Sequence, residues 1–452
     1  MCDLPGQAQQ QGDSILKKIA VIGGGYVGLV VAMGFTQVGH SVVVSERDSD
    51  RVRRLRTGDP VIHEPRLREL LQTSLASDLV RFTTDNSAAV TGVDAVFLAL
   101  PTPGQADGNV DVSSIYAALG DIVADLSDTS IVVTKSTVPV GENARIAAFL
   151  KGRGSNASVV SNPEFLQEGE AVDHFLKPDR IVIGSPDDYA NQRVVELYAS
   201  MPGERVVVSD TATAEIIKYA SNAFLATKIA FINDIAQLCD TVGGDVVVVA
   251  QAMGMDDRIG GKFLHSGPGF GGACLPKDTS ALSRISSSVG VRQMILEAVT
   301  EANFKHIAYV GTRVAGILGG LKNCTIGIFG VAFKAGTDDS RDSPAVTIIR
   351  QLTDGGATVK AFDPMATLPT DLLDRQVASW EEAVTDVDAL VILTEWPEFA
   401  ALDYSQVARL MRGSVVYDTR NVLEPTSIQS CGLTYVGMGR PPIDETRGVT
   451  TP

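Results

Sequence analysis

The sequence predicts an α/β protein with two Rossmann-like doubly wound domains joined by a mainly helical central domain. A strand–glycine turn–helix–strand pattern near the N-terminus recurs in weaker form in the C-terminal third, and a long helical pattern without proline or glycine lies between them. The length of 452 residues exceeds what one hydrophobic core usually serves. The expected parts are a disordered lead over 1–14, a first Rossmann domain over 15–205, a central domain over 206–318, a second Rossmann-like domain over 319–440 and a tail over 441–452.

The composition narrows the class of protein before any motif is considered. With 38 basic and 54 acidic residues the formal charge is -16, which argues against a nucleic-acid or anionic-membrane partner. The scattered cysteines form no CxxC pair and no metal-ligand spacing, so we expect reduced thiols and no metal site. The stretch 19–44 contains no Asp, Glu, Lys or Arg, but Gly23-Gly24-Gly25 interrupts it where a strand would meet a helix. We therefore expect a cytoplasmic protein without a membrane span.

The N-terminal glycine pattern predicts a dinucleotide site. The buried strand 18–22 leads into Gly23-x-Gly25-x-x-Gly28, an apolar helix follows, and the next strand, 41–44, ends close to Glu46. Such glycines allow a tight turn and close approach of a pyrophosphate, and an acid about twenty residues on binds the ribose hydroxyls. Glu46 would repel a 2′-phosphate and so favours NAD, although Arg47 beside it leaves NADP open. The alternative is a glycine-rich turn that binds no cofactor.

Polar residues then follow the ends of successive predicted strands. Thr102, Thr137 and Glu164 come just after the strands expected at 95–100, 130–134 and 158–160. Any one of them alone is better explained by turn or cap chemistry. Their shared position favours function, because open α/β sheets bind ligands at the carboxyl ends of their strands.

A glycine-rich stretch in the middle of the chain, Gly267–Asp278, ends in a candidate nucleophile. Its glycines permit close approach of a ligand, and Pro276 suits the first turn of a following helix. Cys274 would then lie at a helix N-terminus with Lys277 close by, and both features lower the pKa of a thiol. The alternative is a buried cysteine beside a glycine turn.

The central region is predicted to contain two long helices. Residues 212–240 carry apolar side chains at helical spacing, and 291–317 form a second such pattern. Lys218 and Asn222 share one face of the first helix, although a surface lysine would explain Lys218 equally well. Long exposed helices of this kind are candidates for self-association.

The C-terminal third predicts an anion site. After the strand 324–329, an extended loop carries Lys334 and Arg341 toward the N-terminus of a helix at 344–352. Helix N-termini and basic side chains both favour anions, although a surface role for the two is the alternative. Arg420 follows a later strand, 414–418.

Together these stretches resemble the UDP-glucose/GDP-mannose dehydrogenase family over nearly the whole chain. The resemblance implies an NAD-binding N-terminal domain, a helical dimer-forming centre and a C-terminal domain that binds a nucleotide sugar. It also implies a four-electron oxidation of UDP-glucose to UDP-glucuronate with two NAD, and a homodimer or higher homo-oligomer. The matching stretches are Gly23–Gly28, Lys135–Gly141, Asn162–Gly169, Lys177–Arg180, Glu215–Phe224, Arg258–Gly260, Gly267–Asp278, Gly330–Lys334 and Asp338–Pro344.

The resemblance also implies roles for particular residues. Cys274 would form a thiohemiacetal and then a thioester, Lys218 and Asn222 would stabilise the oxyanion, and Asp278, Glu164 and Thr137 would position or activate water. The implied cofactor-binding residues are Gly23, Gly25, Tyr26, Val27, Gly28, Glu46, Arg51, Thr102, Thr137, Glu168, Lys277 and Arg341. The implied substrate-binding residues are Glu164, Phe165, Leu166, Lys218, Asn222, Arg258, Phe263, Gly271, Lys334 and Arg420.

Two departures from the family pattern leave the identity of the sugar substrate undecided. Ala273 stands where serine is more frequent, and Leu275 stands where UDP-glucose enzymes often carry phenylalanine and GDP-mannose enzymes leucine. GDP-mannose or another UDP-hexose is therefore the alternative substrate. An NAD-binding regulatory protein would be expected to lack Cys274, Lys218 or Asp278. A thiol-dependent hydrolase would need a histidine partner that no motif supplies.

Overall fold

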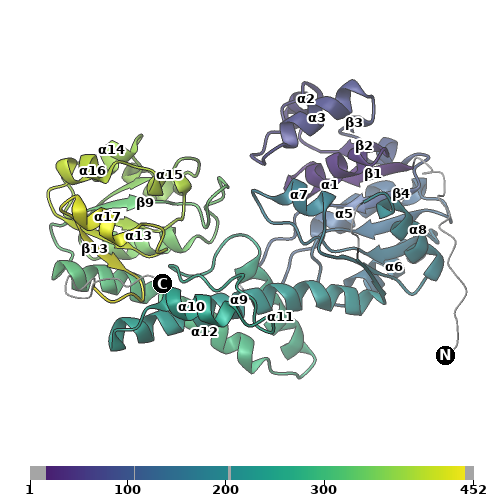
Figure 1. The fold of residues 1–452 in the computed structure, drawn as a ribbon. Coiled ribbons are helices and arrows are strands. Elements are labelled where there is room, and N and C mark those ends of the chain that lie inside the picture. The colour runs from purple at the N-terminus through teal and green to yellow at the C-terminus, as the bar shows by residue number, and fades with distance from the viewer. Residues whose placement is uncertain (1–16, 106, 202–204, 443–452) are drawn as a thin grey trace, which may run out of the picture. The chain divides into compact units, whose positions relative to one another are not determined.

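The N-terminal sheet contains β1 as an inner strand, and the predicted dinucleotide turn connects β1 to α1 (Figure 1). Among the residues that this computed structural model describes, 17–105, 107–201 and 205–442, the sheet has eight strands in the order β3-β2-β1-β4-β5-β6-β7-β8. All neighbours are parallel except β6 and β7, which pair antiparallel at Ser161 and Gly184. The strands are β1 Lys18–Ile22, β2 Ser41–Ser45, β3 Val80–Thr83, β4 Ala95–Leu98, β5 Ile131–Thr134, β6 Ser158–Ser161, β7 Ile181–Gly184 and β8 Val206–Ser209.

Two hydrophobic cores account for the apolar runs of this sheet. Phe97 and Val133 belong to one cluster and Val96 and Val132 to another, so alternate residues of a strand serve separate cores. Strands buried on both faces read as continuous apolar runs, which is why the sequence located them well. The helices of this part are α1 Tyr26–Gln37, α2 Ser49–Arg56, α3 Leu67–Ala76, α4 Asn86–Val90, α5 Ser113–Ile122 with the 3₁₀ turn Val123–Asp125, α6 Glu142–Gly152, α7 Ala171–Leu176 and α8 Asp188–Tyr198.

The central helices agree with the sequence pattern. α9 spans Thr211–Val242 and α12 spans Met294–Leu318, close to the predicted 212–240 and 291–317. Two further helices, α10 Val246–Gly254 and α11 Leu275–Ser288, lie between them in the chain. Among the described helices, none is long and apolar enough to cross a membrane.

The C-terminal sheet is a smaller, fully parallel relative of the first. Its described strands have the order β10-β9-β11-β12-β13, and Ile326, Ile328, Leu390 and Val416 belong to its hydrophobic core. The strands are β9 Thr325–Phe329, β10 Thr358–Phe362, β11 Ala389–Ile392, β12 Val415–Asp418 and β13 Thr434–Gly437. The helices are α13 Pro344–Asp354, the 3₁₀ turn Thr370–Arg375, α14 Trp380–Val384, α15 Pro397–Ala400, α16 Tyr404–Leu410 and α17 Pro425–Ser430.

The predicted architecture of two Rossmann-like sheets joined by a helical centre is confirmed. By its internal contacts the chain divides into a first unit, up to Thr102 plus Asp111–Lys218, and a second unit, Pro103–Val110 plus Tyr219 onward. One predicted boundary differs, because β8, beyond residue 205, completes the first sheet. Its four residues are too short a run to stand out in the sequence. The predicted lead over 1–14 lies outside the described residues, as does the tail beyond residue 442.

Candidate functional site

The first unit aligns four candidate residues along one edge of its sheet. Gly23 follows β1, Thr102 lies beyond β4, Thr137 beyond β5 and Glu164 beyond β6, and these four parallel strands are neighbours in the sheet. The carboxyl ends of such strands are where open α/β sheets bind ligands. The predicted grouping at strand ends is therefore present in the fold.

The glycine turn after β1 has the geometry that a dinucleotide needs. Gly23 has φ +109°, and its N–H donates to the carbonyl of Ser45 at 2.8 Å. A Cβ on Gly28 would lie 1.9 Å from the Gly23 carbonyl oxygen, so the third glycine is required by packing within the turn. A Cβ on Gly25 would meet nothing within 4 Å. Gly25 therefore leaves open space where a pyrophosphate would approach the backbone, and these residues fit NAD.

Glu46 is held toward this turn. Its Oε2 accepts a hydrogen bond from the Gly24 N–H at 3.2 Å and lies 3.6 Å from an Arg51 guanidinium nitrogen. The other oxygen accepts the Asp48 N–H at 3.0 Å. A carboxylate fixed beside the turn suits the hydroxyls of a ribose, and Arg51, an implied cofactor residue, lies beside it.

Tyr26 and Glu64 connect the dinucleotide turn to the loop after β6. The hydroxyl of Tyr26 donates to Glu64 Oε2, and burial with this carboxylate raises the pKa of Tyr26. Glu64 also accepts the N–H groups of Gly169 at 2.8 Å and Ala171 at 2.7 Å. Glu64 thus fixes the loop that carries Glu168. The sequence analysis assigned Glu64 no role, since a single acid in a loop gives no periodic signal.

The most informative contact of the first unit is the buried ion pair of Lys218 and Glu164. Lys218 Nζ donates to Glu164 Oε1 at 2.9 Å, with 4% and 8% of the two residues exposed. Burial works against ionisation of Glu164, but the charge and hydrogen bond of Lys218, the Leu166 N–H and the charge of Lys135 lower its pKa overall. Lys218 is therefore a buried member of an ion pair and no surface lysine.

The Phe165 ring lies close to two cations of the same unit. The guanidinium carbon of Arg180 is 3.7 Å from the ring centroid, and Lys218 Nζ is 5.4 Å from it. The main-chain N–H of Leu166 donates to Glu164 Oε2 at 2.6 Å. The predicted substrate residues Phe165 and Leu166 thus each lie next to a member of the ion pair, Phe165 to Lys218 and Leu166 to Glu164. Val27 is partly buried and packs against the hydrophobic core.

In the second unit Cys274 occupies the predicted position at a helix start. It is the N-cap residue of α11, with Pro276 in the first turn, and it is exposed. Asp278, 1% exposed, accepts a hydrogen bond from Asn222 Nδ2 at 2.6 Å and forms an ion pair with Lys277. The alternative of a buried structural cysteine is excluded. Lys277 is directed to Asp278, one turn of helix beyond the thiol.

Three buried polar side chains hold the glycine loop that precedes Cys274. Asn233 on α9 accepts the Gly267 N–H at 2.9 Å, and His306 on α12 bonds the Gly267 carbonyl at 2.8 Å. Asn303 on α12 accepts the Phe270 N–H at 2.8 Å and donates to the Phe270 carbonyl at 3.0 Å. Burial lowers the pKa of His306 to about 4, so this ring is neutral near pH 7. Sequence analysis missed all three side chains, because buried polar groups on a helix resemble surface ones in pattern.

Other loop residues have conformations that constrain their identity. Phe263 has φ +65°, a left-handed conformation that is strained for an aromatic residue and that tends to occur at functional positions. A Cβ on Gly271 would lie 2.3 Å from the Asp342 carbonyl oxygen. Glycine is therefore required at this implied substrate position because two backbone segments meet there.

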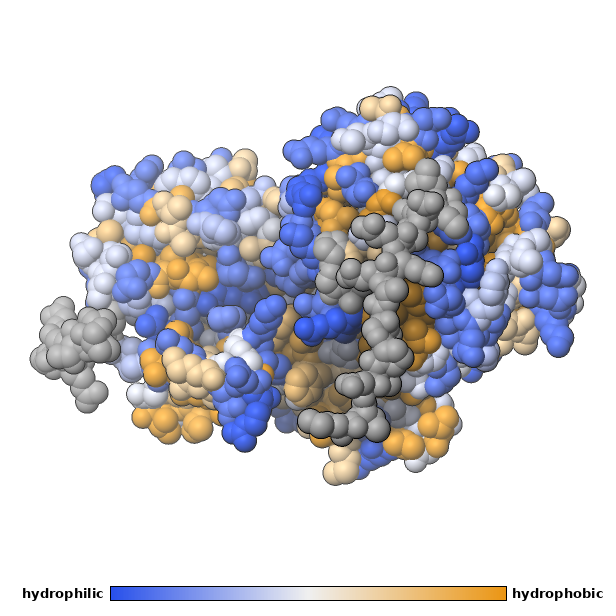
Figure 2. Space-filling model, turned by 45° about the vertical axis from the view of Figure 1, so that its right-hand side comes forward, coloured by the Kyte–Doolittle hydropathy of each residue, from blue (hydrophilic) through white to orange (hydrophobic). Residues whose placement is uncertain are grey.

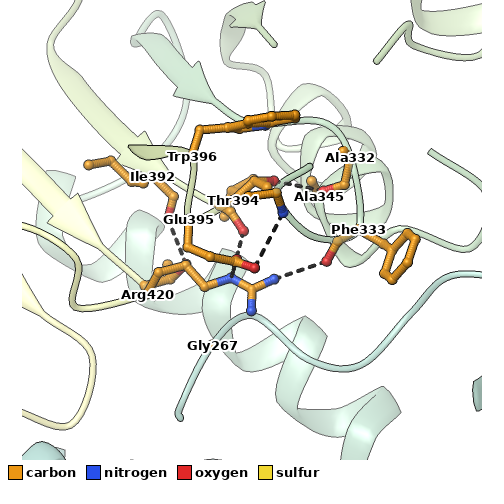
Figure 3. Close-up of polar contacts among 12 residues, drawn as sticks. Gly267, Ala332, Phe333, Ala345, Ile392, Thr394, Glu395, Trp396 and Arg420 are labelled. Carbon is orange, nitrogen blue, oxygen red and sulfur yellow. Dashed lines mark hydrogen bonds and ion pairs between the residues drawn. The ribbon is translucent and has the colours of Figure 1, made fainter. Parts of the chain in front are cut away.

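Arg420 is fixed by its surroundings at the end of β12 (Figure 3). Its Nε donates to the Leu393 carbonyl and lies 3.0 Å from Glu395 Oε2, and an Nη donates to the Phe333 carbonyl at 3.1 Å. Arg420 also lines a hollow of about 630 Å³ together with residues of α10 and of the 261–266 segment. This arginine is thus pre-positioned at a cavity, as an anion-binding residue should be.

The remaining predicted basic residues differ in exposure. The side chain of Arg258 is 88% exposed. Its guanidinium forms a bidentate ion pair with Asp256, in which Nη2 lies 2.5 Å from Oδ2. Arg341 is 69% exposed and pairs with Asp339, Nη2–Oδ2 2.6 Å. Lys334 is half-buried in the loop between β9 and α13. No group of three or more His, Cys, Asp or Glu that could hold a metal is present among the described residues.

Comparison with known proteins gives a consistent result. The chain matches models of the UDP-glucose/GDP-mannose dehydrogenase family for the NAD binding domain at residues 17–202, the central domain at 212–305 and the UDP binding domain at 327–425. It is 41% identical to the UDP-glucose 6-dehydrogenase of Rhizobium meliloti, covering 94% of this chain and 100% of that one. It is also 41% identical to UDP-glucose 6-dehydrogenase TuaD of Bacillus subtilis, covering 95% and 94%.

Solved structures agree with these relatives. A UDP-glucose dehydrogenase from Pyrobaculum islandicum superposes with a TM-score of 0.87 at 37% identity, covering 96% of this chain and 100% of that one. A UDP-D-ManNAc dehydrogenase from Pyrococcus horikoshii gives 0.84 at 25% identity, covering 94% and 99%.

The dinucleotide turn, the two Rossmann-like sheets and these relatives define a dinucleotide-dependent oxidoreductase. More narrowly, the chain belongs to the UDP-glucose/GDP-mannose dehydrogenase family. The predicted cofactor, NAD, is confirmed by the match to the NAD binding domain of this family.

Proposed function

We propose that this protein oxidises UDP-glucose to UDP-glucuronate in two steps at one carbon, with Cys274 as the covalent nucleophile. The observation that carries the proposal is the exposed thiol at the N-cap of α11, followed one turn later by the buried Asp278. Relatives at 41% identity over nearly their full length are UDP-glucose 6-dehydrogenases, which supports this substrate. The residues of the glycine turn and Glu46 would hold NAD, which supplies the hydride acceptor when bound.

The chemistry requires that the intermediate aldehyde be retained between the two oxidations. Removal of a hydride and a proton from the primary alcohol gives an aldehyde, and addition of the Cys274 thiolate converts it to a thiohemiacetal. Loss of a second hydride and proton gives a thioester. Water then cleaves the carbon–sulfur bond, which releases the carboxylate and restores the thiol.

The other residues would act on protons and charge. Lys218 and Asn222, one turn apart on α9, would donate to the oxyanion that develops at the reacting carbon. The lowered pKa of Glu164 keeps its carboxylate ionised, so it would be present as the proton acceptor for water, and Asp278 and Thr137 would orient that water. Phe165, Leu166, Phe263, Lys334 and Arg420 would contact the sugar nucleotide.

The test of this proposal is the Cys274→Ala variant. We expect net conversion to the acid to fall by several orders of magnitude, on the order of 10⁴ or more, since nucleophile and oxyanion support act as a unit. NAD and UDP-glucose should still bind in calorimetric titrations, because the thiol is one small contact among many. Wild-type protein quenched during turnover should carry a mass adduct on Cys274. Release of two NADH per UDP-glucose by the alanine variant at near wild-type rate would refute the covalent role.

Substrate identity is tested separately with a panel of nucleotide sugars. UDP-glucose should give the highest kcat/KM, with GDP-mannose and other UDP-hexoses turned over far more slowly. Leu275, a residue that GDP-mannose enzymes share, makes GDP-mannose the substrate to compare first. A preference for GDP-mannose would leave the covalent chemistry intact and correct the sugar.

We also propose self-association through the central helices of a cytoplasmic protein. Along α9, Phe224, Phe231 and Leu238 recur every seven residues and expose 64%, 48% and 54% of their surface. Hydrophobic side chains are also grouped in separate patches among hydrophilic ones on the face in Figure 2. An apolar stripe of this kind is costly to leave in water, and the family resemblance implies that Arg258 would reach a neighbouring subunit's substrate. Sedimentation of a fully active monomer at assay concentration would refute this proposal.

A further inference from the structure

A buried acid near the start of α9 has no part in the chemistry described so far. Glu215 is the first residue of the matching stretch Glu215–Phe224 and is 2% exposed. Its Oε1 accepts the main-chain N–H of Asn143 at 2.9 Å and the side-chain Nδ2 of Asn143 at 2.7 Å. Its Oε2 accepts the Gly141 N–H at 2.5 Å. Both carboxylate oxygens are therefore directed at the start of α6.

Glu215 supplies the side-chain cap that α6 does not have in its own sequence. The N-cap residue of α6 is Gly141, which has φ +88° and no side chain to accept the first N–H groups of the helix. A carboxylate at this position is favoured because the N–H groups need acceptors and because the helix dipole is positive there. Since this cap comes from another helix, it joins the first turn of α6 to the first turns of α9.

The same contact closes the loop after β5. Thr134, the last residue of β5, donates its hydroxyl to Asn143 Oδ1 at 2.5 Å. Asn143 is fully buried, so it bonds the end of the strand with its side-chain oxygen and Glu215 with its two kinds of N–H group. The intervening loop carries Thr137. Both ends of that loop are therefore tied to one pair of side chains, Asn143 and Glu215.

On α9 itself, Glu215 lies one turn before Lys218. Residues three apart on a helix lie on the same side of it. While Glu215 bonds the loop after β5, Lys218 Nζ donates to Glu164 Oε1, in the loop after β6, at 2.9 Å. One turn of α9 thus bonds two neighbouring loops at the same edge of the sheet.

Close packing limits the other movements of this part of α9. A Cβ on Gly184, the last residue of β7, would lie 2.5 Å from both the Asp210 carbonyl oxygen and Ala214 Cβ. The helix therefore cannot come nearer to the sheet. Apolar contact of this kind leaves rotation of a helix about its own axis less restricted, and a hydrogen-bonded carboxylate fixes that rotation.

We propose that Glu215 is a positioning residue that aligns Lys218 with Glu164 and holds Thr137 in the loop beside them. This inference rests on the proposed function, in which Lys218 would stabilise the oxyanion and Glu164 and Thr137 would act on water. Without the Glu215 carboxylate, α9 is free to rotate and the loop after β5 loses the bonds at its far end. A displacement of about 1 Å at a distance from the chemistry can cost about 10²-fold in rate.

The experiment compares Glu215→Ala with Asp187→Ala as a matched control. Asp187 also accepts three donors at the start of a helix, namely two N–H groups of α8 at 3.0 and 3.3 Å and the Ser158 hydroxyl at 2.6 Å. Ser158 is the first residue of β6, whereas Glu164 lies beyond the last. Asp187 therefore makes the same kind of contact at the amino end of the strand, away from the candidate site.

Both variants should have a lower melting temperature, but only Glu215→Ala should lose turnover. Measured well below both melting temperatures, its kcat should fall by about 10- to 100-fold with a much smaller change in KM, since the loss lies in the alignment of reacting groups. The kcat of Asp187→Ala should stay close to that of wild type. Glu215→Gln keeps an acceptor for Asn143 but directs an N–H at the Gly141 N–H, so its kcat should lie between wild type and Glu215→Ala.

Amide hydrogen exchange of the same variants gives a readout that does not need activity. In Glu215→Ala, exchange should become faster both in residues 135–143 and in residues 211–218 of α9, because the two segments lose their shared anchor. In Asp187→Ala the faster exchange should be confined to β6 and α8. Should Glu215→Ala fail to fold, Glu215→Gln provides the same comparison.

Three outcomes would overturn the proposal. A loss of kcat in Glu215→Ala no larger than in Asp187→Ala would make Glu215 a structural residue only. Faster exchange in residues 135–143 without any change in α9 would show that Glu215 does not hold the helix of Lys218. An increase in KM with unchanged kcat would assign Glu215 to binding. Failure of the wild type to oxidise any nucleotide sugar would instead refute the proposed function, and the exchange series would still test whether Glu215 holds the loop and the helix together.

Discussion

The turn after β1 and the loop after β9 begin with the same backbone geometry but have different roles. Gly23 and Gly330 both have positive φ, +109° and +99°, at the end of a central parallel strand. Each donates its N–H at 2.8 Å to the last residue of the adjacent strand, Ser45 or Phe362. An acidic residue follows that strand in both cases. The local geometry is therefore shared by the two Rossmann-like sheets.

The two acids have different partners. Glu46 accepts one N–H from its own turn, at Gly24, and a second from Asp48. Asp363 is bonded on all sides: its carboxylate accepts five N–H groups, from Val331, Ala332, Met365, Ala366 and the Trp396 indole. A carboxylate so fully bonded maintains its loop and has no capacity for a ribose. The same topological position thus supplies a cofactor residue in one sheet and a structural one in the other.

The largest expected effect is the loss of stability in Asp363→Ala. Each buried donor left without a partner costs about 1–3 kcal/mol, so removing this acceptor should lower the free energy of unfolding by more than about 4 kcal/mol. Glu46→Ala should cost less than about 1 kcal/mol, since Glu46 accepts only two N–H groups and one of them, that of Asp48, is on an exposed residue. Chemical denaturation of both variants measures these changes in the free energy of unfolding. Similar losses for the two would erase the distinction between a structural and a cofactor acid.

The next comparison is between two glycines of the first turn. Gly28→Ala places a methyl group 1.9 Å from the Gly23 carbonyl oxygen and should lower both the melting temperature and NAD binding. Gly25→Ala meets no protein atom within 4 Å, so its melting temperature should match wild type while NAD binding weakens by about tenfold, because the methyl group occupies the pyrophosphate approach. Thermal unfolding and calorimetric titration with NAD, carried out on both variants, distinguish the loss of stability from the loss of NAD affinity. Undiminished NAD affinity in Gly25→Ala would place the dinucleotide elsewhere.

These regions also show what the sequence could predict. The turn after β1 was located because its function needs glycines at fixed spacing, and strands such as β4 because both faces are buried. The roles of Asp363, Asn303 and His306 were not predicted. Each depends on backbone groups far away in sequence, and a buried acid or amide bonding to a distant backbone leaves no pattern in its own neighbourhood. Lys135 lay within a recognised motif, but its burial against Asn162 and Tyr198 comes from three separate segments.

A smaller effect is expected on the choice between NAD and NADP. Glu46 beside the turn should repel a 2′-phosphate, so the wild type should prefer NAD by about tenfold or more in kcat/KM. Glu46→Ala should narrow that preference mainly by improving NADP, because Arg51, 3.6 Å from the carboxylate, would then face the phosphate. Comparable wild-type turnover with both cofactors would show that Glu46 does not set this preference.

The smallest expected effect concerns the loop after β9. Because the Asp363 carboxylate there already accepts five N–H groups, other side chains must bind the ligand. Lys334, half-buried just beyond the Asp363-bonded segment, should supply charge to a diphosphate, so Lys334→Ala should weaken UDP-glucose binding by severalfold, the scale of one phosphate contact. NAD affinity should not change, because the dinucleotide turn belongs to the other sheet.

Lys322→Ala is the matched control, because Lys322 is an exposed lysine before β9 whose loss should affect the binding of neither ligand. Raising the salt concentration should reduce the difference between Lys334→Ala and wild type, since part of the attraction is screened. Equal losses of UDP-glucose and NAD binding would show that the substitution damages the fold, and no loss of either would leave the anion site to Arg420 and its neighbours.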